Sequence, residues 1–167
     1  MSKNNVIVLG IHYGHDSGAA IVQNGKVLAA INEERIRNIK HFNGIPSKSI
    51  SEVIKISKID PSQIDLISIV GILDVENKPD QIDTIYAHLY FTWNPITVHK
   101  QGANCFIAYN ERFRKLTELK KELSQLGISS KQILFVDHHM AHAASAYYLS
   151  PWDISEEVLI FTADAAG

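Results

Sequence analysis

Short apolar runs rich in β-branched residues open the chain, and small or polar residues separate them. The runs span residues 5–12, 18–23 and 26–32, and Asn24-Gly25 lies between the second and the third. Runs of this length predict strands, and an Asn-Gly pair between two of them predicts a tight hairpin turn. We therefore expect an antiparallel meander of three strands.

A helix is expected between the polar break at residues 43–47 and the pair Asp60-Pro61. Ser49 and Glu52 have the spacing of a capping box, which marks the start of a helix. The helix should end before this pair, because the residue preceding a proline avoids the helical conformation.

Apolar patterning continues along the rest of the chain, except in one stretch. Residues 72–109 contain Pro79 and Pro95 and show little periodicity, so a helix within 80–92 is the most that they suggest. Elsewhere the pattern predicts two helices, at 110–126 (with Gly127 as its stop) and 139–149, and three strands, at 65–71, 133–136 and 157–164.

The order of these elements, a meander followed by alternating helices and strands, predicts an α/β fold with a mixed sheet and helices on both faces. The chain ends at Gly167, just after the last expected strand. We expect that strand to be the start of a further unit, and to be poorly satisfied unless it packs on a neighbour.

Composition and charge narrow the class of protein. Of the 167 residues, 46% are apolar and 20% are charged, and the net charge is −2. These values are typical of a globular protein and argue against a nucleic-acid or membrane surface, which needs clustered cations. The sequence shows no long apolar window and no signal-peptide pattern, and the lone Cys105 cannot form an internal disulfide, so we expect a cytoplasmic protein.

Clustered histidines form the first candidate site. The motif DHHMAHAAS places His138 and His142 four residues apart at the start of a helix, so both imidazoles can reach one ion. The helix dipole favours their neutral, ligating form. Asp164 is the candidate carboxylate, and this donor set suits iron, zinc or manganese. The alternative is a helix start without metal, capped by Asp137, with His139 structural.

The turn between the first two expected strands is the second candidate, as a cofactor-binding turn. Its small residues let backbone amides approach an anion, and its acid can position a metal-bound or nucleophilic group; the residues concerned are Gly14, Asp16 and Ser17. The alternative is a hairpin in which the side chains bond their own backbone. Lys40 and His41 suit an anionic oxygen if they fold back on this turn, although the charged run around them is typical of a solvated face.

Four motifs occur in order: GIHYGHDSGAAIVQNGKVLAAINEER, KHFNGIP, DHHMAHAASAYY and FTADAAG. As an ordered set they resemble the amino-terminal part of the O-carbamoyltransferases that tailor nodulation factors and antibiotics such as tobramycin and cephamycin. The resemblance is close over residues 5–58 and 130–167, whereas residues 72–109 match nothing in it.

This resemblance implies a fold and a reaction. The fold is that of the actin, hexokinase and Hsp70 group (ribonuclease H-like), similar to tRNA threonylcarbamoyladenosine synthase. Residues 1–155 would form its first lobe, and residues 156–167 the first strand of a second lobe. The reaction uses carbamoyl phosphate and ATP to make carbamoyl-adenylate in a separate domain, and then transfers the carbamoyl group to a hydroxyl of a small-molecule or sugar acceptor.

Carried over residue by residue, the resemblance also implies roles for particular side chains. His138, His142 and Asp164 match the positions that bind a divalent metal, with iron expected. His15 matches a residue near the carbamoyl group, where it can accept a proton, and Lys40 matches a lysine that can stabilise developing negative charge.

Members of that family are much longer than this chain. The second lobe, another metal acid and the adenylate-forming domain are therefore expected to be supplied in cis or in trans, and the chain alone to be inactive. One alternative is a truncated, non-catalytic module that holds metal or nucleotide. A phosphotransferase of the same superfamily is less favoured, because such enzymes generally lack the HHMAH pair.

Overall fold

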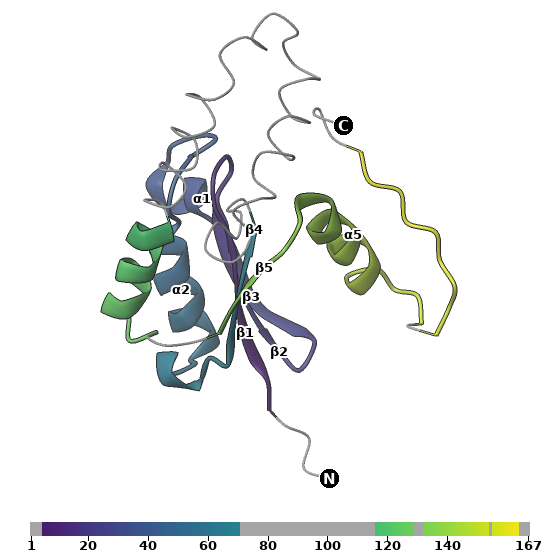
Figure 1. Ribbon diagram of the computed structural model, residues 1–167, viewed down its shortest axis with the longest axis horizontal. Coiled ribbons are helices and arrows are strands. Elements are labelled where there is room, and N and C mark those ends of the chain that lie inside the picture. Colours follow the sequence, from purple (N-terminus) through teal and green to yellow (C-terminus); the bar gives the residue numbers. More distant parts are fainter. Residues whose placement is uncertain (1–4, 71–115, 129–131, 154, 164–167) are drawn as a thin grey trace, which may run out of the picture.

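One mixed sheet organises the part of the chain that the computed structural model describes, which is residues 5–70, 116–128, 132–153 and 155–163. The expected meander is present, and two further strands run parallel to its first strand (Figure 1). In the spatial order β3-β2-β1-β4-β5, the strands are β1 (Ile7–His12), β2 (Gly18–Gln23), β3 (Lys26–Asn32), β4 (Leu66–Val70) and β5 (Gln132–Phe135).

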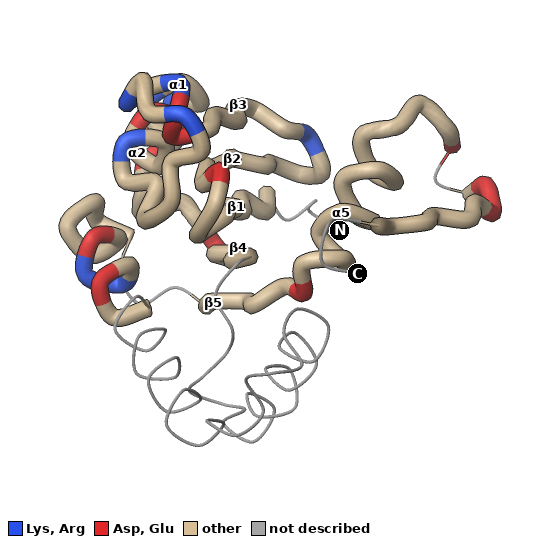
Figure 2. Tube along the Cα trace, turned by 90° about the horizontal axis from the view of Figure 1, so that it is seen from above, with Lys and Arg blue, Asp and Glu red and all other residues tan. Residues whose placement is uncertain are grey.

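Helices lie on both sides of this sheet, as the order of elements predicted. Figures 1 and 2 show α2 (Ser47–Ser57) and the helical residues 116–125 on one side and α5 (His138–Tyr148) on the other. The short α1 (Glu33–Arg37) follows β3, and the 3-10 turn η1 (Pro61–Gln63) precedes β4. The α/β class is therefore confirmed, whereas the assignment to the actin-like group stays a prediction.

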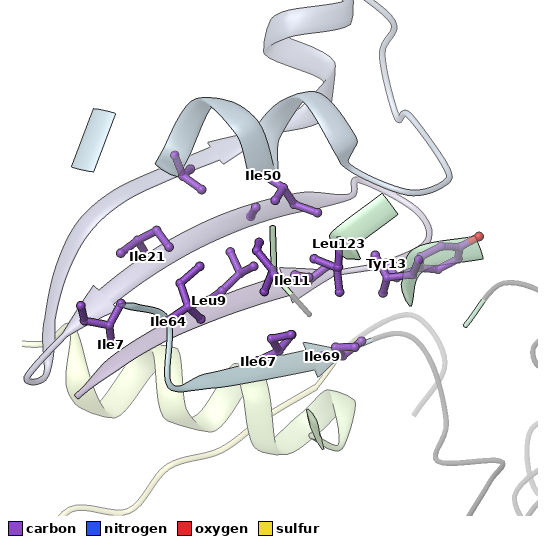
Figure 3. Packing of buried hydrophobic residues seen from close by; sticks show 14 of the residues in the cluster. Ile7, Leu9, Ile11, Tyr13, Ile21, Ile50, Ile64, Ile67, Ile69 and Leu123 are labelled. Atoms are coloured by element: carbon purple, nitrogen blue, oxygen red, sulfur yellow. The ribbon is translucent and has the colours of Figure 1, made fainter. Parts of the chain in front are cut away.

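The hydrophobic core lies between the sheet and α2 with residues 116–125 (Figure 3). β1 shows why: Ile7, Leu9 and Ile11 are buried, while the intervening Val8, Gly10 and His12 are half-buried on the opposite face. The core face meets Ile50 and Val53 of α2 and Leu116, Leu119 and Leu123, none more than 2% exposed. By contrast, α5 has no buried residue.

Local turn chemistry agrees with the sequence at two points. Asn24 and Gly25 both have positive φ, 51° and 79°, as a two-residue hairpin turn requires. Gly127, with φ of 77°, ends the helix as expected. The amide of Ile128 donates to the carbonyl of Leu123 and the amide of Gly127 to that of Ser124, which is the Schellman arrangement.

The predicted start of α2 was wrong. The helix begins at Ser47 with Pro46 as its N-cap, and no capping side chain comes from the helix itself. Ser49 is buried in its first turn instead of forming a capping box with Glu52. The run 33–41 is also more than a solvated face, since it begins with α1 and its first residue, Glu33, is fully buried.

The strand expected at 157–164 is not formed over residues 157–163, which pair with no other described strand. The segment lies open, and Leu159 and Phe161 are 98% and 87% exposed. A strand needs a hydrogen-bonded partner, and its apolar sequence alone does not supply one. The helix suggested within 80–92, the first residues of the helix at 110–126, and Asp164 lie outside the described residues. Within the described residues, no helix is long and apolar enough to cross a membrane.

Candidate functional site

Both histidine motifs lie at the same edge of the sheet. β1, β4 and β5 are parallel neighbours, so their carboxyl ends meet at one edge, where open α/β sheets commonly bind ligands. The chain beyond that edge stays tied to β4: the amide of Tyr13 donates to the carbonyl of Val70 (2.8 Å), and the amide of Val136 to that of Ile69 (2.8 Å). The motif after β1 and the motif after β5 are therefore brought to one place by the intervening β4.

The first turn of α5 presents two imidazoles to each other. The Asp137 side chain accepts from the amide of Met140 (3.0 Å) and so caps the helix, as the alternative interpretation of this motif expected. Nε2 of His138 lies 3.1 Å from Nε2 of His142, and the two rings meet edge to face with centroids 4.5 Å apart. Two ligand atoms of a tetrahedral zinc-like ion are about 3.3 Å apart, given metal–nitrogen bonds of about 2.0 Å. The 3.1 Å separation is that of a hydrogen bond between the two rings, and it is also close to the spacing of two ligands on one ion.

A second cluster forms around Asp16 in the turn after β1. Nδ1 of His15 lies 2.6 Å from one Asp16 carboxylate oxygen, and Nδ1 of His41 lies 2.9 Å from the other. The two rings stack with an interplanar angle of 20° and centroids 5.2 Å apart. All three ligand atoms lie within 4.8 Å of one another, so this group can hold a metal ion. The hydrogen bond from His41 lowers the pKa of Asp16, and the nearby His15 lowers it further, so the carboxylate is ionised at neutral pH.

Backbone hydrogen bonds hold the two loops of this cluster together. The amide of Ser17 donates to the carbonyl of Phe42, and the amide of Gly44 to that of Gly14, both at 3.2 Å. Asp16 and His41 each have a positive φ, 56° and 53°, a conformation that costs energy for residues other than glycine and marks positions fixed by their surroundings. His41 thus folds back on the first turn, which was one condition of the sequence interpretation.

Buried Glu33 links the start of α2 to Arg37, which contacts the loop that contains His41. Its carboxylate accepts from the amides of Ser49 (2.7 Å) and Lys48 (3.2 Å) at the start of α2, and from Nε of Arg37 (2.6 Å). Burial raises its pKa, but these hydrogen bonds outweigh burial and leave the pKa below its ordinary value. The Arg37 guanidinium in turn lies 4.8 Å from the centre of the Phe42 ring. Glu33 therefore connects the start of α2, through Arg37, to Phe42, the residue after His41.

His12 connects the two clusters electrostatically. It is the last residue of β1, on the sheet face opposite the core. Burial lowers its pKa below the ordinary 6.5, His138 and more weakly His142 lower it further, and a hydrogen bond to the backbone of Asp16 raises it in part. Both clusters therefore act on one half-buried imidazole. Sequence reasoning gave His12 no role, although the alternation along β1 would have placed it on this face.

The remaining predicted site residues have different surroundings. Ser17 is buried, and in the described part of the chain its hydroxyl has no hydrogen-bond partner. Gly14 has φ of 120°, a conformation suited to glycine. Lys40 is exposed beside His41. The described residues thus bring His15 and Asp16 together with His41 rather than with Lys40, and Asp164 lies outside them.

α/β domains with histidines at the carboxyl edge of the sheet have many different functions, so the fold alone does not identify the function. Comparison with known proteins narrows the choice of family. The family described as carbamoyltransferase N-terminus matches residues 7–167, and the chain belongs to this family.

Three curated relatives show how far the likeness extends. An uncharacterized protein of Synechocystis sp. is 32% identical over 170 residues, covering 96% of this chain and 25% of that protein. An uncharacterized protein of Methanocaldococcus jannaschii is 29% identical over 193 residues, covering 97% and 31%. The nodulation protein NolNO of Sinorhizobium fredii is 28% identical over 154 residues, covering 92% and 20%. The chain therefore spans less than a third of the length of each.

Proposed function

We propose that the chain is the amino-terminal part of an ATP-dependent O-carbamoyltransferase, which moves a carbamoyl group from carbamoyl phosphate, through carbamoyl-adenylate, to a hydroxyl of a small molecule or sugar. The family match over residues 7–167 carries this proposal. The similarity to NolNO, a nodulation protein, supports it. The sheet edge adds the required chemistry, because a metal-sized histidine pair lies there beside a histidine–aspartate pair.

His138 and His142 would hold the divalent metal, with Asp164 as a further proposed ligand; iron is expected from the resemblance. When bound, such a metal acts as a Lewis acid that polarises a carbonyl group. The spacing of the two Nε2 atoms is the observation that fits this role.

His15 would accept the proton of the acceptor hydroxyl. Asp16 binds the Nδ1 side of its ring at 2.6 Å, which fixes a proton there and leaves Nε2 as the acceptor, the same division of roles as in a catalytic histidine–aspartate pair. The hydroxyl oxygen would then bond to the carbamoyl carbon, and the bond from that carbon to the phosphate oxygen would break, releasing AMP. Lys40 would stabilise the negative charge on the reacting oxygens, and Gly14 and Ser17 would line the turn that receives the carbamoyl donor.

The wider architecture belongs to the same proposal. Residues 1–155 would form the first lobe of an actin-like carbamoyl-transfer domain, and residues 156–167 would begin the second lobe. The exposed Leu159 and Phe161 support this division, because a second lobe would cover them. The adenylate-forming domain would lie elsewhere in the full-length protein or in a partner chain.

Transfer of radiolabelled carbamoyl groups from carbamoyl phosphate to a panel of hydroxyl acceptors tests this proposal in the full-length protein. We expect ATP-dependent transfer, and we expect the double variant His138→Ala/His142→Ala to abolish transfer together with metal binding. His139→Gln, one residue round the same helix, is the matched control and should retain both. A full-length protein that binds metal and nucleotide without transfer or adenylate formation would instead establish the non-catalytic module.

A further inference from the structure

The cluster of His15, Asp16 and His41 has the chemistry of a cation site rather than an anion site. The Asp16 carboxylate lies between the two imidazoles and faces Nδ1 of each, at 2.6 and 2.9 Å. An anion approaching the same ring nitrogens would meet an ionised carboxylate, whereas a cation would meet three ligand atoms. All three belong to loops that backbone hydrogen bonds tie together, so little ordering is needed on binding.

The donor set selects the kind of cation. Two imidazole nitrogens and one carboxylate oxygen suit Zn²⁺, Co²⁺ or Ni²⁺, and suit Mg²⁺ and Ca²⁺ poorly, because those ions prefer oxygen ligands. The present contacts are shorter than the roughly 3.3 Å between ligands of a tetrahedral ion with bonds of about 2.0 Å. A bound ion would replace the hydrogen bonds and lengthen the two histidine–aspartate separations by about 0.7 and 0.4 Å, which the imidazoles, each 68% exposed, permit.

We propose that His15, Asp16 and His41 bind a second divalent cation of the zinc–cobalt class, and that this ion inhibits carbamoyl transfer. The site is separate from the α5 pair, because it uses Nδ1 atoms on the turn after β1 and the loop after α1, whereas the pair uses Nε2 atoms on α5. Its inhibitory role rests on the proposed function of His15.

Inhibition follows from the two nitrogens of one ring. Without the ion, the proton of neutral His15 lies on Nδ1, hydrogen-bonded to Asp16, and Nε2 can accept a proton from the hydroxyl. With the ion on Nδ1, the single proton of the neutral ring must lie on Nε2. His15 then has no nitrogen available as an acceptor, and proton transfer to it stops.

Co²⁺ titration of the metal-free, full-length protein, followed by visible absorption, tests the binding. We expect two ions in the wild type, and one in Asp16→Asn, in His41→Gln and in the double variant His138→Ala/His142→Ala. His139→Gln is the control and should keep both. Unchanged Co²⁺ stoichiometry and affinity in both Asp16→Asn and His41→Gln would overturn the proposal. Loss of an ion from the double variant alone would also overturn the proposal, but it would still support a metal site at His138 and His142.

Zn²⁺ inhibition of carbamoyl transfer tests the role. We expect the Zn²⁺ concentration that halves the transfer rate to be more than about tenfold higher for His41→Gln than for the wild type, because a metal ligand is lost. Each rate is compared with that of the same protein without Zn²⁺, so a change in basal rate does not matter. A transfer rate that stays unchanged in wild-type protein with two ions bound would refute the inhibitory role. If the full-length protein shows no transfer at all, the proposed function fails, and the Co²⁺ stoichiometry still decides whether this second site exists.

Discussion

Removing the Glu33 carboxylate tests how the His41 loop and α2 are held together. In Glu33→Ala, the amides of Lys48 and Ser49 and the Nε of Arg37 lose the acceptor that they share. α2 has no other side-chain cap, since its N-cap is Pro46. Glu33→Gln keeps the shape and one acceptor oxygen but removes the charge, so it separates the hydrogen bonds from the ion pair.

The expected cost can be worked out from these contacts. Removing one partner of a buried ion pair costs about 3–5 kcal/mol. The lower end applies here, because the Arg37 side chain is 29% exposed and water can solvate part of it. We expect a loss of about 3 kcal/mol for Glu33→Ala and about 1–2 kcal/mol for Glu33→Gln. At a urea m-value of about 2 kcal/mol/M, the first loss lowers the unfolding midpoint by about 1.5 M.

Acidification provides an independent check on the same carboxylate. Its pKa in the folded protein lies below the ordinary 4.5. As the pH falls through 4.5, the unfolded chain takes up the proton first, so this contribution is complete above that pH and disappears as the pH falls through the folded pKa. The stability gap between wild type and Glu33→Gln, measured by urea unfolding, should therefore shrink in acid. A loss below about 1 kcal/mol in Glu33→Ala, or a gap that does not change with pH, would refute this account.

Two substitutions and one titration probe the start of β2, the helix end at Gly127 and the shared edge of the sheet. In Gly18→Ala, the added Cβ would lie 2.8 Å from the carbonyl oxygen of Ile31 in the neighbouring strand, so urea unfolding should show a loss of about 1–3 kcal/mol. Gly127→Ala forces a side chain into a φ of 77°, and the same measurement should show a loss of about 1 kcal/mol; no loss would contradict the assigned helix end. In an NMR titration, His12 should titrate below 6.5; a pKa above that value would contradict its burial beside His138.

Local structure was predictable from the sequence wherever neighbouring residues determine it. The meander, the Asn24-Gly25 turn and the end of the helix at Gly127 depend on contacts within a few residues, and each was predicted. The start of α2 was missed because its cap comes from Glu33, which lies 16 residues before Ser49, with which it forms a hydrogen bond. No spacing rule for helix starts reaches that far, since the usual cap lies next to the amides that it satisfies.

In the candidate site, too, the local features were predictable from the sequence and the long-range ones were not. The i, i+4 pair of His138 and His142 and the cap at Asp137 are local, and both were found in the sequence. The approach of His41 to Asp16 was stated only as a condition, because it depends on how the loop after α1 bends. The position of His12 beside both clusters follows from the β1-β4-β5 order, which element order alone did not define.

The orientation of the imidazole rings is the part of the site that no sequence pattern contains, and it has chemical consequences. The α5 pair meets through Nε2 atoms, whereas the Asp16 cluster is built on Nδ1 atoms. An ion at the α5 pair therefore leaves Nε2 of His15 free to accept a proton, while an ion at Asp16 forces a proton onto that nitrogen. Under the proposed function, two metal sites made of the same residue types at one sheet edge would thus have opposite effects on carbamoyl transfer, and the ratio of metal to protein would decide whether transfer occurs.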